Sequence, residues 1–141
     1  MCPQVSLIAK LGESFANSPR GVVSAYLHGS HAEEREHCES DVDVGVLLDY
    51  AEYGNRAQRD EARLALAGQL GVALGRNDVD IVILNDAPAP LARHVALDGI
   101  RVFCQDEEAD HAFRRDVQLR AADLAPFLDR MRRIKLATLR E

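Results

Sequence analysis

Two segments of the chain each place aspartates two residues apart at the start of an apolar run. Asp41 and Asp43 open one run, and Asp78 and Asp80 open the other. Residues i and i+2 of a β-strand point to the same face, roughly 6.6 Å apart along the chain. Carboxylates at that spacing repel each other unless a cation lies between them. Oxygen ligands of this kind suit Mg²⁺, which takes one or two carboxylates together with substrate phosphates.

A third carboxylate makes a metal site a better interpretation than a solvated strand end. If the two strands are neighbours, Asp80 can point to the same spot as Asp41 and Asp43. Three carboxylates on one face are costly without a cation, and they are typical of two-metal phosphoryl and nucleotidyl transfer. We prefer Asp80 to Asp78 because Asp80 lies within the apolar run. Asp78 precedes that run and is interpreted as a turn or capping residue.

Gly29 and Ser30 directly follow the first predicted strand. A glycine there lets the backbone approach a ligand, and the adjacent amides and the serine hydroxyl can hold phosphate oxygens. Taken alone, such a dipeptide is most often a simple turn. The chain has no Walker-type phosphate loop, so P-loop chemistry is excluded.

These residues need a sheet that brings several strand ends together. Apolar periodicity predicts three long helices, at 4–17, at 55–74 and from 107 onward. It predicts four strands, at 22–28, 41–48, 79–84 and 100–104. A short helix is expected between Pro88 and Asp98. The first two strands lack a full crossover helix between them, so we expect them to pair antiparallel. The last strand is expected at an edge. The prediction is an α/β (α+β) fold, a small mixed sheet with helices packed against it, within one domain spanning 1–141.

Composition excludes several classes of protein. The chain has 141 residues, of which 47% are hydrophobic, so it can bury enough apolar surface to fold. No apolar run approaches the ~20 residues that span a bilayer, and we expect no membrane association and a cytoplasmic location. The formal net charge of −6 argues against direct nucleic-acid binding, which needs a basic face.

The C-terminal helical segment, 107–141, differs in charge from the rest. From His111 onward the chain has a net charge of +4, whereas residues 1–110 carry −10. A charge run is usually a solvated face, but an acidic body with a basic tail also suits a protein partner. We expect an apolar stripe on this helix to pack on the sheet, and Pro126 to kink or divide the helix; the stripe consists of Leu124, Phe127, Leu128, Met131 and Ile134.

The spacing of the chemical residues resembles a known signature. Gly29-Ser30, ten residues, then Asp41-Val42-Asp43 resembles the GS-x10-DxD motif of the DNA polymerase beta-like nucleotidyltransferase superfamily. Asp80 looks like the third carboxylate of that superfamily. The short length and the residues after the third strand look most like the minimal nucleotidyltransferase (MNT) family, the antitoxins encoded beside HEPN-domain RNase toxins. The resemblance covers 22–104.

The resemblance implies a reaction and a role for each residue. The reaction would transfer AMP from ATP, with loss of pyrophosphate, to a HEPN-type toxin, typically to a tyrosine hydroxyl. Asp41 and Asp43 would bind two Mg²⁺ ions. Asp80 would bind the catalytic ion and help to deprotonate the acceptor. Gly29 and Ser30 would hold the β- and γ-phosphates.

One departure from the motif keeps alternatives open. Many family members read GSRARG, where this chain reads GSHAEE at 29–34. His31 stands where those members have an arginine, so the loop lacks that positive charge. Glu33 and Glu34 add two carboxylates. This loop favours a second hypothesis, a binding-only antitoxin with little activity. A third is a small-molecule transferase similar to the aminoglycoside nucleotidyltransferases, which usually have an extra domain.

Overall fold

The computed structural model describes residues 4–17, 20–29 and 41–139. The central feature is a four-stranded sheet formed by β1 (Val22–His28), β2 (Val42–Leu48), β3 (Val79–Ile83) and β4 (Ile100–Cys104). The strand order is β3-β2-β1-β4; β1 runs antiparallel to β2 and to β4, and β2 runs parallel to β3. The predicted mixed sheet, the antiparallel first pair and the edge position of 100–104 are all confirmed.

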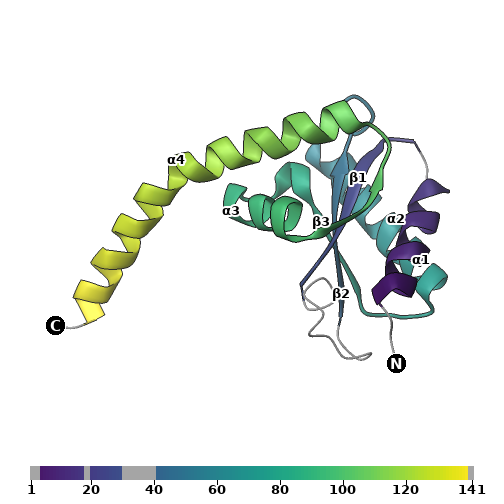
Figure 1. The fold of residues 1–141 in the computed structure, drawn as a ribbon, viewed down its shortest axis with the longest axis horizontal. Helices are drawn as coiled ribbons and strands as arrows, with labels where there is room; N and C mark the ends of the chain where they lie inside the picture. Colours follow the sequence, from purple (N-terminus) through teal and green to yellow (C-terminus); the bar gives the residue numbers. More distant parts are fainter. Residues whose placement is uncertain (1–3, 18–19, 30–40, 140–141) are drawn as a thin grey trace.

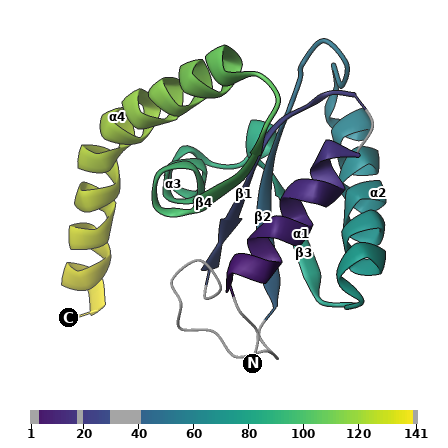
Figure 2. The ribbon, with the colours of Figure 1, turned by 45° about the vertical axis from the view of Figure 1, so that its right-hand side comes forward.

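Two helices cover one face of the sheet (Figures 1 and 2). They are α1 (Gln4–Ala16) and α2 (Arg56–Leu74), and they bury Leu11, Phe15 and Leu70 against the valines of β2. Helix α2 begins at a capping box, in which the side chains of Asn55 and Gln58 each accept a hydrogen bond from the other's backbone amide. It ends at Gly75, whose φ of 67° is the left-handed conformation expected of a residue that follows a helix.

The other face is covered by short helical segments and by the start of the last helix. These are the 3₁₀ turn η2 (Leu84–Asp86), α3 (Ala89–Arg93), the π-helical turn η3 (His94–Asp98) and α4 (Glu107–Leu139). A second apolar cluster joins this face to them, and it contains Val23, Tyr26, Leu47, Leu84, Val95 and Ala96. The sheet therefore has a core on both faces.

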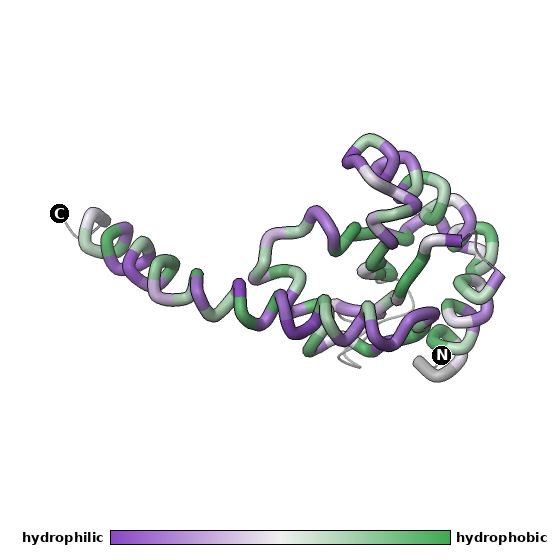
Figure 3. Tube along the Cα trace, turned by 90° about the horizontal axis from the view of Figure 1, so that it is seen from above, coloured by the Kyte–Doolittle hydropathy of each residue, from purple (hydrophilic) through white to green (hydrophobic). Residues whose placement is uncertain are grey.

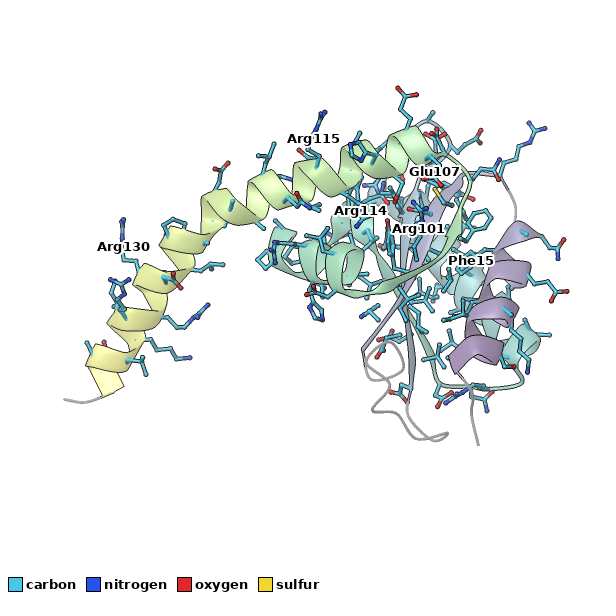
Figure 4. The ribbon with its side chains drawn as sticks, in the orientation of Figure 1. Phe15, Arg101, Glu107, Arg114, Arg115 and Arg130 are labelled. Atoms are coloured by element: carbon cyan, nitrogen blue, oxygen red, sulfur yellow. The ribbon has the colours of Figure 1, made fainter. Side chains whose placement is uncertain are left out.

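One buried carboxylate attaches α4 to the sheet. Asp110 has an exposed fraction of 1%, and it accepts hydrogen bonds from Ser24 Oγ at 2.6 Å and Tyr26 Oη at 2.5 Å. Arg101 Nη1 donates to its other oxygen at 3.1 Å and also contacts Glu107 (Figure 4). Burial, followed by the hydrogen bond to Asp110, raises the pKa of the Tyr26 hydroxyl. The charge of Asp110 is thus compensated by three donors.

The second half of α4 does not pack as expected. Ala121 is the last buried residue, and every described side chain from Ala122 to Thr138 is exposed. The prediction that the stripe of Leu124, Phe127, Leu128, Met131 and Ile134 packs on the sheet is therefore wrong. Helix α4 continues through Pro126, and Figure 1 shows it bent and leaving the body, so the proline kinks the helix without dividing it. None of the described helices is both long and apolar enough to cross a membrane.

Replacing Asp110 by alanine should be strongly destabilising. The hydroxyls of Ser24 and Tyr26 would lose their acceptor inside the protein, at about 1–3 kcal/mol for each buried unsatisfied group. We expect Asp110→Ala to lower the free energy of unfolding by about 3 kcal/mol in urea titrations followed by circular dichroism. Asp129→Ala, on the exposed half of the same helix, is the matched control and should change it by less than about 0.5 kcal/mol. Equal effects of the two variants would contradict this role for Asp110.

Two residues after β3 attach this strand to its neighbours. Asn85 Oδ1 accepts from the Leu48 amide at 2.9 Å, and Asn85 Nδ2 donates to the Leu48 carbonyl at 2.8 Å. Asp86 forms a bidentate pair with the buried Arg59 guanidinium, with both distances 2.9 Å. The hydrogen bond to Arg59 is the main cause that lowers the pKa of Asp86. The pair connects the start of α2 to the end of β3.

The Asp86–Arg59 pair predicts a pH dependence of stability. Because the folded-state pKa of Asp86 lies below its ordinary value of about 4, the stabilisation is present above that value and is lost as pH falls through the lowered pKa. Asp86→Asn should therefore lower the melting temperature at pH 7 by a few degrees, and the difference from wild type should shrink as pH falls below about 4. The exposed Asp123→Asn should show no such convergence in the same melting series.

Candidate functional site

The candidate site lies where three strand ends meet. The carboxyl end of β1 carries His28 and Gly29, while the amino ends of β2 and β3 carry Asp43 and Asp80. Because β1 runs antiparallel to β2 and β2 runs parallel to β3, these ends lie at the same edge of the sheet. The topology therefore brings together residues that are up to 52 positions apart in the sequence.

Strand register places a histidine and two aspartates in one row. His28 pairs with Asp43 across β1 and β2, and Asp43 pairs with Asp80 across β2 and β3. Residues paired in register point to the same face, and neighbouring strands lie about 4.8 Å apart. Asp43 and Asp80 are thus neighbours on one face, which is the face that also carries Tyr26 and Leu47.

Asp41 and Asp78 lie one step outside this row. Asp41 is exposed and directly precedes β2, where the amide of Val42 donates to the Asp78 carbonyl at 3.0 Å. The Asp78 carboxylate is bound by Arg76, at 2.7 and 2.8 Å. This agrees with the interpretation of Asp78 as a turn residue. The hydrogen bond to Asp78 is the main cause that raises the pKa of Arg76, with a smaller contribution from Asp41.

Gly29 is constrained by the carboxylate of Asp43. Its φ is 76°, in the left-handed region that favours glycine. A Cβ at this position would lie 2.5 Å from Asp43 Oδ2. The backbone of Gly29 therefore lies directly against one of the predicted ligands. Ser30, His31, Glu33 and Glu34 lie outside the described residues, and the phosphate-binding role of Gly29 and Ser30 stays a prediction.

His28 is the residue that the sequence analysis missed. Its Nε2 is buried and has no hydrogen-bond partner within the described residues. Burial lowers the pKa of the imidazole, and the nearby carboxylates of Asp43 and Asp80 oppose that shift. A signal was available, because His28 follows Tyr26 by two positions and immediately precedes Gly29. Antiparallel pairing of the first two strands then places it opposite Asp43.

A second glycine lets a helical turn approach the site. Gly45 follows Asp43 on the same face of β2, and a Cβ there would lie 2.5 Å from Val95 Cγ1 of η3. The absence of a side chain allows η3 to pack directly on the strand. The turn also brings His94, which lowers the pKa of His28 further, near the acidic row. One side of the site is therefore bounded by η3.

The carboxylates suit a hard cation but do not form a closed cage. Asp43 and Asp80 share a face, and Asp41 precedes Asp43 by two residues, so the donors are oxygen atoms of the kind that Mg²⁺ prefers. Within the part of the chain that the structure describes, no three His, Cys, Asp or Glu side chains gather closely enough to hold a metal ion. The residue types fit Mg²⁺, and the binding of an ion by Asp41, Asp43 and Asp80 stays a prediction.

Comparison with protein families gives one match over most of the chain. The family model described as Polymerase beta, Nucleotidyltransferase matches residues 10–108. That range includes all four strands and every residue of the candidate site. No curated protein matches the chain significantly.

Solved structures give matches over nearly the whole chain. A crystal structure of a toxin–antitoxin with AMP-PNP has a TM-score of 0.66 and 26% identity, covering 88% of this chain and 97% of that one. A structure of a tri-AMPylated HEPN toxin from Shewanella oneidensis in complex with an MNT antitoxin has a TM-score of 0.61 and 23% identity, covering 92% and 98%. A toxin–antitoxin structure of MntA and HepT has a TM-score of 0.60 and 24% identity, covering 89% and 97%. The likenesses below 25% identity indicate a shared fold.

The contact between Gly29 and Asp43 can be tested with a matched pair of variants. Gly29→Ala adds a Cβ against the carboxylate, and it also strains a positive φ. Gly75→Ala strains a similar φ of 67°, but its Cβ would meet nothing within 4 Å. We expect Gly75→Ala to cost about 1 kcal/mol in urea unfolding and Gly29→Ala up to about 1 kcal/mol more, because the Asp43 carboxylate must rotate away from the new Cβ. Equal losses would show that the Asp43 carboxylate does not constrain Gly29.

Proposed function

The chain belongs to the polymerase beta nucleotidyltransferase family, and on that premise we propose that it is an Mg²⁺-dependent antitoxin that transfers AMP from ATP to a HEPN-type RNase toxin. The observation that carries this proposal is the register that sets Asp43 beside Asp80, with Gly29 against the Asp43 carboxylate. The likeness at 26% identity to a toxin–antitoxin with AMP-PNP supports a nucleotide substrate and a toxin partner. The AMPylated HEPN toxin in the S. oneidensis complex supports the reaction type.

The residues of this chain have distinct tasks in the proposed reaction. Asp41 and Asp43 would hold Mg²⁺ together with the ATP phosphates, and Asp80 would hold the ion nearer the acceptor. Bound Mg²⁺ would neutralise phosphate charge and stabilise the leaving pyrophosphate. The Gly29 backbone and the Ser30 hydroxyl would hold the β- and γ-phosphates. The predicted acceptor is a tyrosine hydroxyl of the toxin.

The proposed transfer is an in-line displacement at the α-phosphorus of ATP. The acceptor oxygen forms a bond to the α-phosphorus of ATP, and the bond from that phosphorus to the bridging oxygen breaks. Pyrophosphate leaves with that oxygen. The hydroxyl proton passes to a carboxylate oxygen of Asp80, which acts as the general base. Neutral His28 beside Asp43 adds no positive charge to compete with the cation.

Transfer of label tests the reaction. The protein is mixed with a HEPN-type toxin, Mg²⁺ and ATP labelled at the α-phosphate. We expect label to appear on the toxin, and ATP labelled at the γ-phosphate should give none. Removing Mg²⁺ with EDTA should abolish transfer. Complex formation without any label would instead favour the binding-only antitoxin.

Removing the metal-binding charge should stop transfer while the fold persists. Asp41→Asn with Asp43→Asn keeps side-chain shape but weakens the hold on a cation, so we expect transfer to fall by at least about 100-fold. Asp49→Asn, at the opposite end of β2 and exposed, is the matched control and should retain wild-type transfer. Melting temperatures should confirm that both proteins remain folded. Unchanged transfer by the double variant would overturn the assignment of Asp41 and Asp43.

A further inference from the structure

The distal half of α4 is an arm that leaves the body of the protein. Its first half is held by buried residues, Asp110, Val117 and Ala121, whose exposed fractions are 1%, 0% and 9%. Beyond Ala121 the described side chains are all exposed, and Figures 1 and 2 show the helix extending past α3. We call 122–139 the arm.

Large apolar side chains gather on one face of the arm. Leu124, Phe127, Leu128, Met131 and Ile134 recur at intervals of three and four residues, which places them on one side of a helix. We call these five residues the distal stripe. Figure 3 shows apolar and polar residues alternating along this part of the tube. Phe127, Met131 and Ile134 have exposed fractions of 54%, 50% and 55%. An apolar stripe of this length on an exposed helix is typical of a protein interface.

The distal stripe is flanked by positive charge. The arm contains four basic residues, Arg130, Arg132, Arg133 and Lys135, against Asp123 and Asp129, for a net charge of +2. At 100° per residue, Arg130 and Arg132 border the stripe on its two sides, whereas Arg133 lies on the opposite face. Arg130 projects away from the body in Figure 4. Two such arms would repel each other, so the charge disfavours contact between the arms of two copies and favours a surface with carboxylates.

A groove beside the stripe adds a concave surface. Its volume is about 600 Å³, and it lies between the α3–η3 segment and α4. Pro90, Arg93 and Leu97 form one wall, and Ala125, Leu128 and Arg132 contribute to the other. Leu128 belongs to both the groove and the distal stripe, so the two form one continuous surface. Its two arginines, Arg93 and Arg132, outnumber its one lining carboxylate, Asp129, so the groove has the same preference for acidic groups.

We propose that the distal stripe and this groove form the docking surface for a helix of the toxin, whose apolar face is bordered by Asp and Glu. The proposal rests on the proposed function and adds the place and chemistry of contact. An amphipathic helix laid along the arm would cover the apolar side chains and pair its carboxylates with Arg130 and Arg132. Residues 1–110 carry a net charge of −10 and the chain is basic from His111 onward, so an acidic partner is attracted to α4 rather than to the body.

The binding of toxin without nucleotide tests the docking surface independently of catalysis. In isothermal titration calorimetry, Phe127→Asp with Met131→Asp should raise the Kd for the HEPN-type protein at least about 100-fold. Leu119→Asp, also exposed on α4 but before the arm, should change it less than about twofold. Both side chains in the double variant are exposed, so its melting temperature should match that of wild type.

Two charge-reversal variants test whether carboxylates of the toxin helix pair with the basic residues of the arm. At low salt, Arg130→Glu should raise the Kd about 5- to 10-fold, and Arg115→Glu, on the first half of the same helix, less than about twofold. Salt should weaken the wild-type complex more than the Arg130→Glu complex. Equal salt dependence of the two complexes would overturn the proposed pairing of Arg130 with toxin carboxylates.

The outcomes separate this proposal from the proposed function. If Phe127→Asp with Met131→Asp binds the toxin as tightly as wild type, the docking surface is overturned. The proposed function still stands in that case if the wild-type protein transfers AMP to the toxin. If the wild-type protein shows neither binding to the toxin nor AMP transfer, both the docking surface and the proposed function are overturned. If sedimentation shows wild-type dimers that the double variant lacks, the stripe is a self-association surface and the proposal is wrong. Binding of the arm to vesicles of anionic lipid, without binding to the toxin, would also overturn the docking surface.

Discussion

The site depends on the register of β2, which pairs with β1 on one side and with β3 on the other. A slip of one residue in either pairing would turn a carboxylate to the opposite face, because strand side chains alternate. Both faces of β2 are buried, by valines against α1 and α2 and by Leu47 against η3. The apolar core therefore specifies the register, and the register in turn specifies where Asp43, Asp80 and His28 meet.

Two glycines show how closely the backbone is matched to this row. Gly29 leaves room for the Asp43 carboxylate, and Gly45 leaves room for Val95. Both occur where a side chain would push another element away from the strand ends. The polar row is consequently bounded by backbone on one side and by η3 on another.

The Asp110 network gives the last helix its two different halves. Hydrogen bonds from Ser24, Tyr26 and Arg101 hold the first turns of α4 on the sheet. The direction of the helix is then determined near its start, and its 33 residues extend beyond the sheet and α3. The exposed apolar arm is thus a consequence of a buried attachment at its base. The carboxylate row and the arm thus lie on different elements of the fold.

The sequence by itself determined the elements, the mixed sheet, the antiparallel first pair, and Asp41, Asp43, Asp80 and Gly29 as the residues to consider. These follow from local periods, turn residues and the length of connections, which act within one segment of chain. Only the tertiary structure decided that His28 joins the row, that Ser24 and Tyr26 bind Asp110, and that the stripe on α4 stays exposed. An amphipathic pattern shows that a face needs a partner, but it does not show whether the same chain supplies one. Such contacts join segments far apart in sequence, and no local pattern encodes them.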